Sequence, residues 1–184
     1  WNPLEAKLVE RILRRAEETL EVSARVGVIA PYARQKDHIR KRVAPLVKDA
    51  SKLEISLEDI DSIDSFQGGE RDIIIISFTR SPKVEQCKKC GGNGEHKGTS
   101  CKQCAGTGKA WRGSRFSFLL DLKRLNVAFS RAKCMLILVG DVEALMNSQF
   151  STVNHKGHEI IRRFNDYVQD RGKVLRVWEE GVHN

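Results

Sequence analysis

Long apolar runs are missing from this sequence, and we expect no secretory leader. No run approaches the roughly 20 apolar residues that a membrane-spanning helix needs, so we expect no membrane partner. The first residues, Trp1-Asn2-Pro3, lack the charged segment and apolar stretch of a signal peptide. Because they also lack an initiating Met, we expect the chain to be a piece of a longer protein.

Cysteines are not spread along the chain in the way that a small secreted disulfide scaffold requires. Four of the five lie within residues 87–104, and the fifth, Cys134, adjoins an apolar stretch. This usage favours a reducing compartment, the cytoplasm or else the nucleoid or nucleus.

Acidic residues are too few to balance the basic ones. The 32 lysines and arginines exceed the 24 aspartates and glutamates, which leaves a net charge of +8. With 40% hydrophobic and 30% charged residues, the 184 residues suit one globular domain with a core of its own. The basic balance favours acidic partners, nucleic acid first among them, although a merely solvated basic surface has the same composition.

Apolar periodicity predicts alternating helices and strands in the first third of the chain. A strand is expected over 26–30 and a helix over 33–44, which Pro45 should end or disturb. Asn2 and Pro3 suit the start of an earlier helix. Its apolar residues then recur every four positions, at Leu4, Leu8, Ile12, Ala16 and Leu20.

The same alternation continues to the end of the chain. A short strand is expected near 60–64, followed by a glycine loop and by the β-branched run 73–78. Strands alternating with helices predict an α/β fold in which a parallel sheet is flanked by helices. The later expected elements are a helix within 118–132, a strand over 135–139, helices near 142–148 and 156–171, and an apolar stretch at 174–178.

An interruption at 83–114 is rich in glycine and cysteine and nearly free of aliphatic side chains. Two CxxC pairs, separated by ten residues, are each followed by glycines. Four thiolates suit a tetrahedral Zn²⁺ site with no open position, so the zinc would be structural. We expect residues 1–82 and 115–184 to form the α/β domain and 83–114 to be an inserted zinc knuckle. The expected ligands are Cys87, Cys90, Cys101 and Cys104.

The repeated pattern CxxCxGxG over 87–108 resembles half of the cysteine-rich domain of DnaJ-type chaperones. That resemblance supports a metal knuckle and carries no chaperone function. Two disulfides or two redox-active dithiols are the alternatives to zinc, and His96 is a conceivable further ligand. The knuckle also carries cations that suit either a nucleic-acid backbone or a solvated face: Lys88, Lys89, Lys97, Lys102, Lys109 and Arg112.

Three polar segments, each joined to an apolar strand or helix, contain the candidate functional residues. Residues 28–35 lead a strand into Pro-Tyr and then Gln. Residues 63–77 carry the loop Ser-Phe-Gln-Gly-Gly-Glu onto a strand, and residues 124–133 place Asn, Ser and Arg near one face of a helix. Each segment alone has a plain structural explanation, so their order and spacing carry the argument.

Together the three segments resemble motifs IV, V and VI of the superfamily-one helicase group that includes the nonsense-mediated-decay helicase. The segment Asn2-x-x-Glu5-Ala6 resembles the one that precedes motif IV, and residues 135–141 resemble the one that follows motif VI. The resemblance covers almost the whole chain outside 83–114. It implies a RecA-like fold and the second of the two motor domains between which such helicases bind ATP with Mg²⁺.

The resemblance also implies contacts with the nucleotide. Glu70 matches the acid that accepts hydrogen bonds from the ribose hydroxyls, in a motif V loop that includes Gln67 and Gly68. Arg131 matches the arginine finger that reaches the γ-phosphate, which makes it the catalytic candidate. Gln35 matches the motif IV glutamine and is expected at the nucleotide too.

Nucleic-acid contacts and departures from the family pattern complete the comparison of residues. Pro31, Tyr32 and Ser65 lie where the family's nucleic-acid-facing loops fall. Gly69 stands where the family often has Arg, so any contact of that Arg is lost, and Ser130 replaces the commoner Thr while keeping its hydroxyl. An insertion between motifs V and VI is unusual for this group.

The phosphate-binding pattern GxxxxGK[ST] is missing from the chain. The nearest strings, at 97–99 and 106–109, lie inside the knuckle, and Asp141 has no such loop as a partner. We therefore expect an N-terminal RecA-like domain of the same protein to supply the triphosphate cradle, the Mg²⁺ ligands and the catalytic base. Alone, this chain should not hydrolyse ATP.

The favoured interpretation is the second motor domain of an ATP-dependent helicase or translocase. Its partner would be a single strand of DNA or RNA, with 5′ to 3′ movement implied by the resemblance. Two other interpretations stay open. One is a non-catalytic zinc-containing nucleic-acid-binding module, and the other is a protein-interaction platform built around the knuckle.

Overall fold

A five-stranded sheet forms the centre of the fold. The computed structural model describes residues 1–66, 69–79, 83–104, 106–112, 121–146 and 155–174. The strand order is β2-β1-β4-β9, with β3 also paired to β1, and each of these pairs is parallel. The predicted α/β class with a parallel sheet is therefore confirmed. The strands are β1 (Ala24–Ile29), β2 (Leu53–Glu54), β3 (Ile60–Asp61), β4 (Arg71–Ser77) and β9 (Ala132–Val139).

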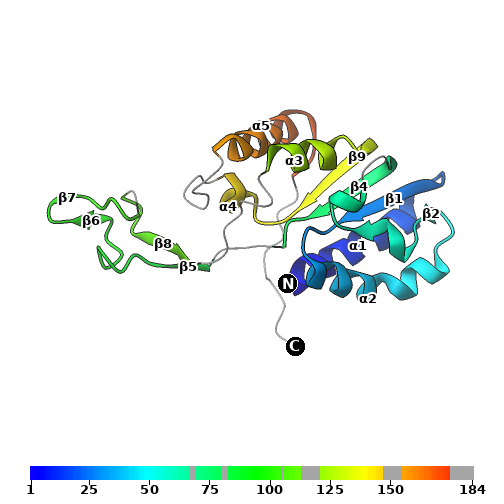
Figure 1. Cartoon of the computed structure of the whole chain (residues 1–184), viewed down its shortest axis with the longest axis horizontal. Coiled ribbons are helices and arrows are strands. Elements are labelled where there is room, and N and C mark those ends of the chain that lie inside the picture. Colours follow the sequence, from blue (N-terminus) through cyan, green and yellow to red (C-terminus); the bar gives the residue numbers. More distant parts are fainter. Residues whose placement is uncertain (67–68, 80–82, 105, 113–120, 147–154, 175–184) are drawn as a thin grey trace.

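Helices cover both faces of the sheet (Figure 1). Helices α1 (Pro3–Thr19) and α2 (Ala33–Asp49) pack together on one face. Helices α3 (Leu122–Phe129) and α5 (His155–Arg171) cover the other face, near the short helix α4 (Val142–Met146). None of the helices in the described ranges is long and apolar enough to cross a membrane.

The run of four isoleucines in β4 supplies both halves of the core. Because successive side chains of a strand point to opposite faces, Ile73 and Ile75 join the core under α1 and α2, whereas Ile74 and Ile76 join the core under α3 and α5. A continuous apolar run is what a strand buried on both faces needs. This is the reason that β4 was the clearest strand in the sequence.

Helix α1 begins as predicted, but its buried face is shifted. The Asn2 side chain caps the helix by accepting a hydrogen bond from the Glu5 amide at 3.3 Å. The fully buried apolar residues are Ala6, Val9 and Leu13. The predicted four-residue series lies at the margin of this face, where Leu8, Ile12, Ala16 and Leu20 are partly buried.

Pro45 was predicted to end or disturb helix α2, and the first of these two alternatives is wrong. The helix continues through Pro45 to Asp49. Proline removes one backbone hydrogen bond, but Pro45 lies on the exposed side, where water can solvate the carbonyl left without a partner. Val43 and Leu46 on either side are buried in the core and hold the last turns against the sheet.

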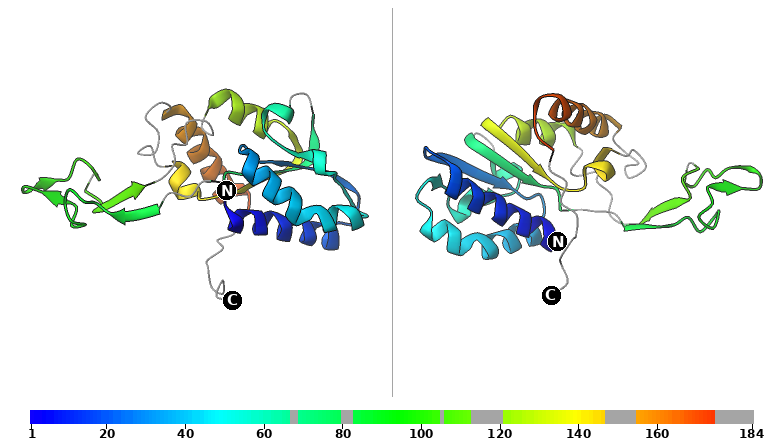
Figure 2. Two further views of the ribbon diagram at one scale, coloured as in Figure 1. Left: turned by 60° about the horizontal axis from the view of Figure 1, so that its bottom comes forward. Right: turned by 180° about the vertical axis from the view of Figure 1, so that it is seen from behind.

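The cysteine-rich segment forms an arm that projects from the sheet domain (Figures 1 and 2). Strands β5 (Lys83–Gln86) and β8 (Lys109–Arg112) pair antiparallel at its base. A small hairpin of β6 (Glu95–His96) and β7 (Thr99–Ser100) lies farther out. Figure 1 shows the arm at the end of the domain where β4 ends.

Candidate functional site

Glu70 and Arg131 are brought together at the edge of the sheet where β4 and β9 begin. The amide of Arg71 donates a hydrogen bond to the carbonyl of Arg131 at 2.9 Å, which joins the two strand entrances. At the same edge, the Lys133 ammonium lies 3.5 Å from the Glu70 carboxylate. Both side chains of this ion pair are exposed, at 54% for Glu70 and 44% for Lys133. This amino edge therefore presents an acid and cations side by side.

The end of helix α3 holds the Arg131 guanidinium. Its Nε donates to the carbonyl of Val127 at 3.2 Å, and its terminal nitrogen donates to the Ser130 hydroxyl at 3.1 Å. The Ser130 hydroxyl itself donates to the Val127 carbonyl at 3.1 Å. Carbonyls in the last turn of a helix have no partner within the helix, so they can accept these bonds. The Ser130 hydroxyl is thus one of the two groups that hold the Arg131 guanidinium in place.

Gln67 and Gly68, the other motif V candidates, lie outside the described residues. The 3-10 helix η2 (Asp64–Phe66) just before them is anchored to the sheet by Phe66. Gly27 in β1 makes room for this ring, because a Cβ there would lie 2.7 Å from the Phe66 ring. The helix η2 is therefore fixed over the sheet by the Phe66 ring.

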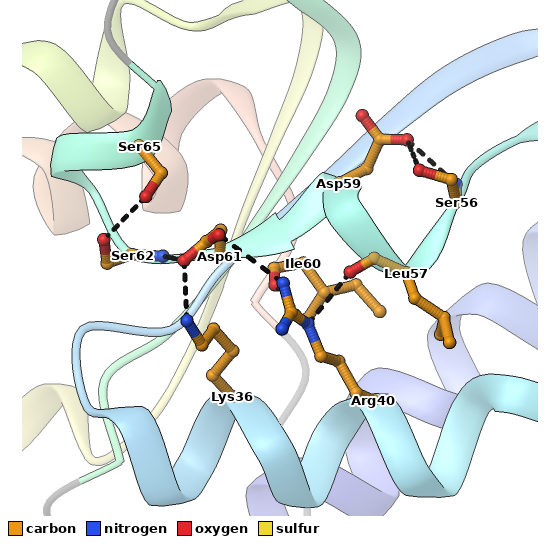
Figure 3. Close-up of polar contacts among 9 residues, drawn as sticks. All are labelled: Lys36, Arg40, Ser56, Leu57, Asp59, Ile60, Asp61, Ser62 and Ser65. Carbon is orange, nitrogen blue, oxygen red and sulfur yellow. Dashed lines mark hydrogen bonds and ion pairs between the residues drawn. The ribbon is translucent and has the colours of Figure 1, made fainter.

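Polar side chains from α2 fix the end of β3 at the opposite, carboxyl edge (Figure 3). The Asp61 carboxylate accepts hydrogen bonds from the Lys36 ammonium at 3.0 Å and from the Ser62 amide at 2.6 Å. The Arg40 guanidinium lies 3.4 Å from the same carboxylate and donates to the carbonyls of Leu57 and Ile60. Partial burial raises the pKa of Asp61, but the hydrogen bonds from Lys36 and Ser62 outweigh it, so the pKa is lowered.

The three predicted nucleic-acid residues gather at this carboxyl edge, but only one of them is exposed. The Ala30 amide donates to the Asp61 carbonyl at 2.9 Å, which brings Pro31 and Tyr32 beside the turn that carries Ser65. Ser65 is exposed, and its hydroxyl lies 3.1 Å from the Ser62 hydroxyl (Figure 3). Pro31 is buried and Tyr32 is half-buried against the core. Ser65 is therefore the member best placed to meet a strand.

Gln35 does not lie with Glu70 and Arg131. It follows the carboxyl end of β1, is 0% exposed, and bonds within the fold. Its side-chain oxygen accepts from the Asn2 amide at 2.7 Å, and its nitrogen donates to the Asn2 carbonyl and to the Ser77 hydroxyl, each at 3.1 Å. These bonds use the amide group to tie α1 to α2 and β4, so the structure gives Gln35 a role in packing.

Glu5 is the buried acid that the sequence argument left without a role. It is 3% exposed, and its carboxylate accepts from the Ser77 hydroxyl and from the Thr79 amide, both at 2.7 Å. Burial raises the pKa of Glu5 to about 7, although the bonds from Ser77 and Thr79 act in the opposite direction. Thr79 has a φ of 71°, a left-handed conformation that is strained for a β-branched residue, and the Glu5 bond holds it there.

The arm gathers the four clustered cysteines into one group that fits a metal. The sulfurs lie within 4.8 Å of one another, with Cys87 to Cys101 at 3.9 Å and Cys90 to Cys104 at 3.6 Å. Four thiolates at about 2.3 Å from a central Zn²⁺ would stand about 3.8 Å apart. All four cysteines are buried and none is in a disulfide.

Two glycines explain why the CxxC pairs are followed by GxG. A Cβ on Gly94 would collide with the Gly106 carbonyl oxygen, and a Cβ on Gly108 would collide with that of Gly92. Both positions also have a positive φ, at 83° and 71°. The glycines after one CxxC pair thus pack backbone against backbone with those after the other. Burial of Cys90 acts against ionisation, but the nearby amides of Gly94 and Gly92 lower its pKa to about 7, which favours the thiolate.

Comparison with known proteins identifies the family. The profile of the family described as "AAA domain" matches residues 1–143. The chain belongs to this family. It is 31% identical over 144 residues to Regulator of nonsense transcripts 1 of Dictyostelium discoideum and 27% identical over 143 residues to Helicase SEN1 of Saccharomyces cerevisiae. It is also 28% identical over 183 residues to the probable helicase senataxin of Mus musculus.

These relatives confirm the resemblance to the superfamily-one helicase group of the nonsense-mediated-decay type. The matches cover 78%, 78% and 96% of this chain, but only 9%, 5% and 6% of the three relatives. The chain therefore spans less than a tenth of each relative's length. As a domain of this helicase family, it has one edge that presents Glu70 with Arg131 and another that presents Ser65 and the base of the arm.

Proposed function

We propose that the chain is the second motor domain of an ATP-dependent nucleic-acid helicase or translocase. The observation that carries the proposal is the hydrogen bond between the Arg71 amide and the Arg131 carbonyl, which sets Glu70 and Arg131, 61 positions apart in the sequence, at the same edge of the sheet. A carboxylate that can accept hydrogen bonds from the ribose hydroxyls and a guanidinium that can bind the phosphates suit two parts of one nucleotide. The other half of the site, with the triphosphate cradle and Mg²⁺, would belong to an N-terminal RecA-like domain of the same protein.

Arg131 would supply the catalytic contact. Its guanidinium rests on a neutral carbonyl and a hydroxyl, and both are weaker partners than a phosphate. When the two motor domains close on ATP, the guanidinium would exchange Val127 and Ser130 for the γ-phosphate and stabilise the charge that develops during transfer. Glu70 would accept hydrogen bonds from the ribose hydroxyls, and the chain by itself would be inactive.

Arg131→Ala in the full-length protein tests this assignment. Turnover of ATP should fall by roughly 10³-fold or more, while ATP binding largely survives. Arg131→Lys should not rescue turnover, because lysine lacks the planar fork. Arg15→Ala is the matched control, since this exposed arginine pairs with Glu18 on α1, on the opposite face of the sheet from α3. Turnover that is unchanged in Arg131→Ala would sink the arginine-finger role.

At the carboxyl edge we place the track for the single strand, with Ser65 as an exposed hydroxyl donor. A motor that moves along many sequences must hold the strand mainly through its phosphates. Binding should therefore weaken steeply with salt and change little with base sequence. A protein that binds no single strand even at low salt would contradict this part of the proposal.

For the arm we propose one structural Zn²⁺, bound by Cys87, Cys90, Cys101 and Cys104. The ion would hold the two CxxC pairs together in an arm whose buried cluster consists of the four cysteines. Elemental analysis of the purified protein should find one zinc per chain, and Cys101→Ser should lower that content while Cys134→Ser, an exposed thiol outside the cluster, should not. Full zinc content in Cys101→Ser would refute the assignment.

A further inference from the structure

The outer surface of the arm is basic, and its lysine side chains are not needed to build a core. In the described part of the arm, the buried apolar cluster consists of the four cysteines alone. Among the lysine and glutamate side chains of the arm whose burial the structure describes, five lysines and two glutamates are exposed. The lysines are Lys88, Lys89, Lys97, Lys102 and Lys109.

The two halves of the knuckle, each a CxxC pair with the glycines after it, place lysines at matching positions. Lys88 follows the first cysteine of one CxxC pair, and Lys102 follows the first cysteine of the other. The sulfurs of both pairs converge within 4.8 Å, so the two turns belong to one compact body that carries these cations on its outside. Lys89 and Lys102 form no ion pair among the described residues, and neither does Lys88.

The place of the arm in the fold connects this surface with the carboxyl edge. Strand β4 ends at Ser77, and β5 begins at Lys83, so the arm leaves the domain at the carboxyl edge of the sheet (Figures 1 and 2). At the same edge, β3 leads into Ser65, whose hydroxyl lies near that of Ser62 (Figure 3). The chain is fixed in place just before the arm, because the Glu5 carboxylate binds both Ser77 and Thr79 there. Strand β5 alone extends roughly 13 Å, at about 3.3 Å per residue. The lysines are thereby carried beyond the surface of the sheet domain.

We propose that the basic surface of the arm binds the phosphates of the single strand that runs along the carboxyl edge. This inference rests on the proposed helicase function and adds a second contact, outside the motor core, to the same strand. A polyanion is the occupant that a surface of unpaired lysines with few apolar side chains fits best. The contact would be independent of sequence and would lengthen the stretch of strand that the motor holds.

The salt dependence of strand binding by the full-length protein tests the proposal. The variant is Lys88→Gln/Lys89→Gln/Lys102→Gln, and the ligand is a fluorescent single-stranded oligonucleotide. Each lost phosphate contact should lower the slope of log Kd against log salt by about 0.7, so the triple variant should lose up to about 2. The matched control removes the same charge from exposed lysines elsewhere, as Lys41→Gln/Lys48→Gln/Lys173→Gln, and should keep the slope.

Two further readouts separate this proposal from its rivals. The zinc content of the arm variant should stay at the level of the unaltered protein. Zinc loss would mean that the lysines only offset the negative charge of the thiolate cluster, and it would overturn the inference. Equal slopes for the arm variant and its control would also overturn it, while the helicase function stands. If the unaltered protein binds no strand, both the function and the inference fail.

Discussion

The carbonyl of Arg131 accepts a hydrogen bond at 2.9 Å from the amide of Arg71, the residue that follows Glu70. This bond lies at the first position of the β4–β9 pairing, where Arg71 faces Ala132. It couples the backbone of the two candidate nucleotide contacts, so a shift of one strand entrance moves the other. Under the proposed function, a nucleotide bound at Glu70 would thereby be presented to Arg131 in a fixed relation.

Replacement of Glu70 by alanine should weaken ATP binding by the full-length protein and remove its preference for a ribose. A hydrogen bond to a charged group contributes about 1.5–3 kcal/mol, which corresponds to roughly 10- to 150-fold in affinity. The unaltered protein should therefore prefer ATP to 2′-deoxy-ATP, and Glu70→Ala should bind both alike. Competition binding measures this. Glu159→Ala, an exposed acid on α5, should keep the preference, and a preference retained by Glu70→Ala would contradict the ribose contact.

Glu5 should make the chain less stable as the pH rises from about 4.5 to about 7. Its pKa in the folded state is about 7, above the ordinary value of 4.5, so in this window the folded state keeps a proton that the unfolded state has lost. The free energy of unfolding should fall by roughly 3 kcal/mol across it, at about 1.4 kcal/mol per unit. Glu5→Gln should flatten this slope in urea unfolding measured at several pH values. Parallel pH profiles for both proteins would refute the assignment.

Gly94→Ala should prevent the two halves of the knuckle from packing against each other. Its Cβ would meet the Gly106 carbonyl oxygen, so zinc affinity should fall at least tenfold, as after loss of about 1.4 kcal/mol. Gly91→Ala is a sharp control, because Gly91 has a similar positive φ of 62° but open space around its Cβ position. Chelator competition compares the two variants. Equal affinities would show that backbone strain, and not the close approach, limits the fold of the knuckle.

Pro45→Ala should stabilise the chain. Alanine restores the hydrogen bond to the carbonyl of Lys41 and removes the ring clash at an exposed position of α2. The free energy of unfolding should rise by roughly 1–3 kcal/mol, which thermal or urea unfolding would detect. Ala44→Gly, the adjacent position, should change stability in the opposite direction. A loss of stability in Pro45→Ala would show that the ring makes a packing contact that outweighs the missing bond.

Sequence patterns predicted the elements whose signals are local. The isoleucine run of β4 and the Asn2 cap of α1 each depend on neighbouring residues, and both are confirmed. The end expected for α2 at Pro45 was wrong because the decision was not local. Burial of Val43 and Leu46 against the sheet outweighs the lost hydrogen bond.

The candidate site divides in the same way. Arg131 and Glu70 were found from motif order, and the sheet brings them to one edge. Gln35 was grouped with them by motif alone, yet the structure places it at the other edge and buries it. Glu5 could have been found as a site residue from its spacing after Asn2. Its partners Ser77 and Thr79 are more than 70 positions away, however, so only the fold reveals them.

By itself, the sequence determined the parallel α/β class, the helicase motifs and the four cysteines, because periodicity, motif order and CxxC spacing are properties of short segments. The tertiary structure decided which residues meet. Parallel strands deliver residues that precede them to one edge and residues that follow them to the other. That geometry sets Glu70 and Arg131 at one edge, separates both from Gln35, and places the basic arm at the carboxyl edge, where β3 leads into Ser65.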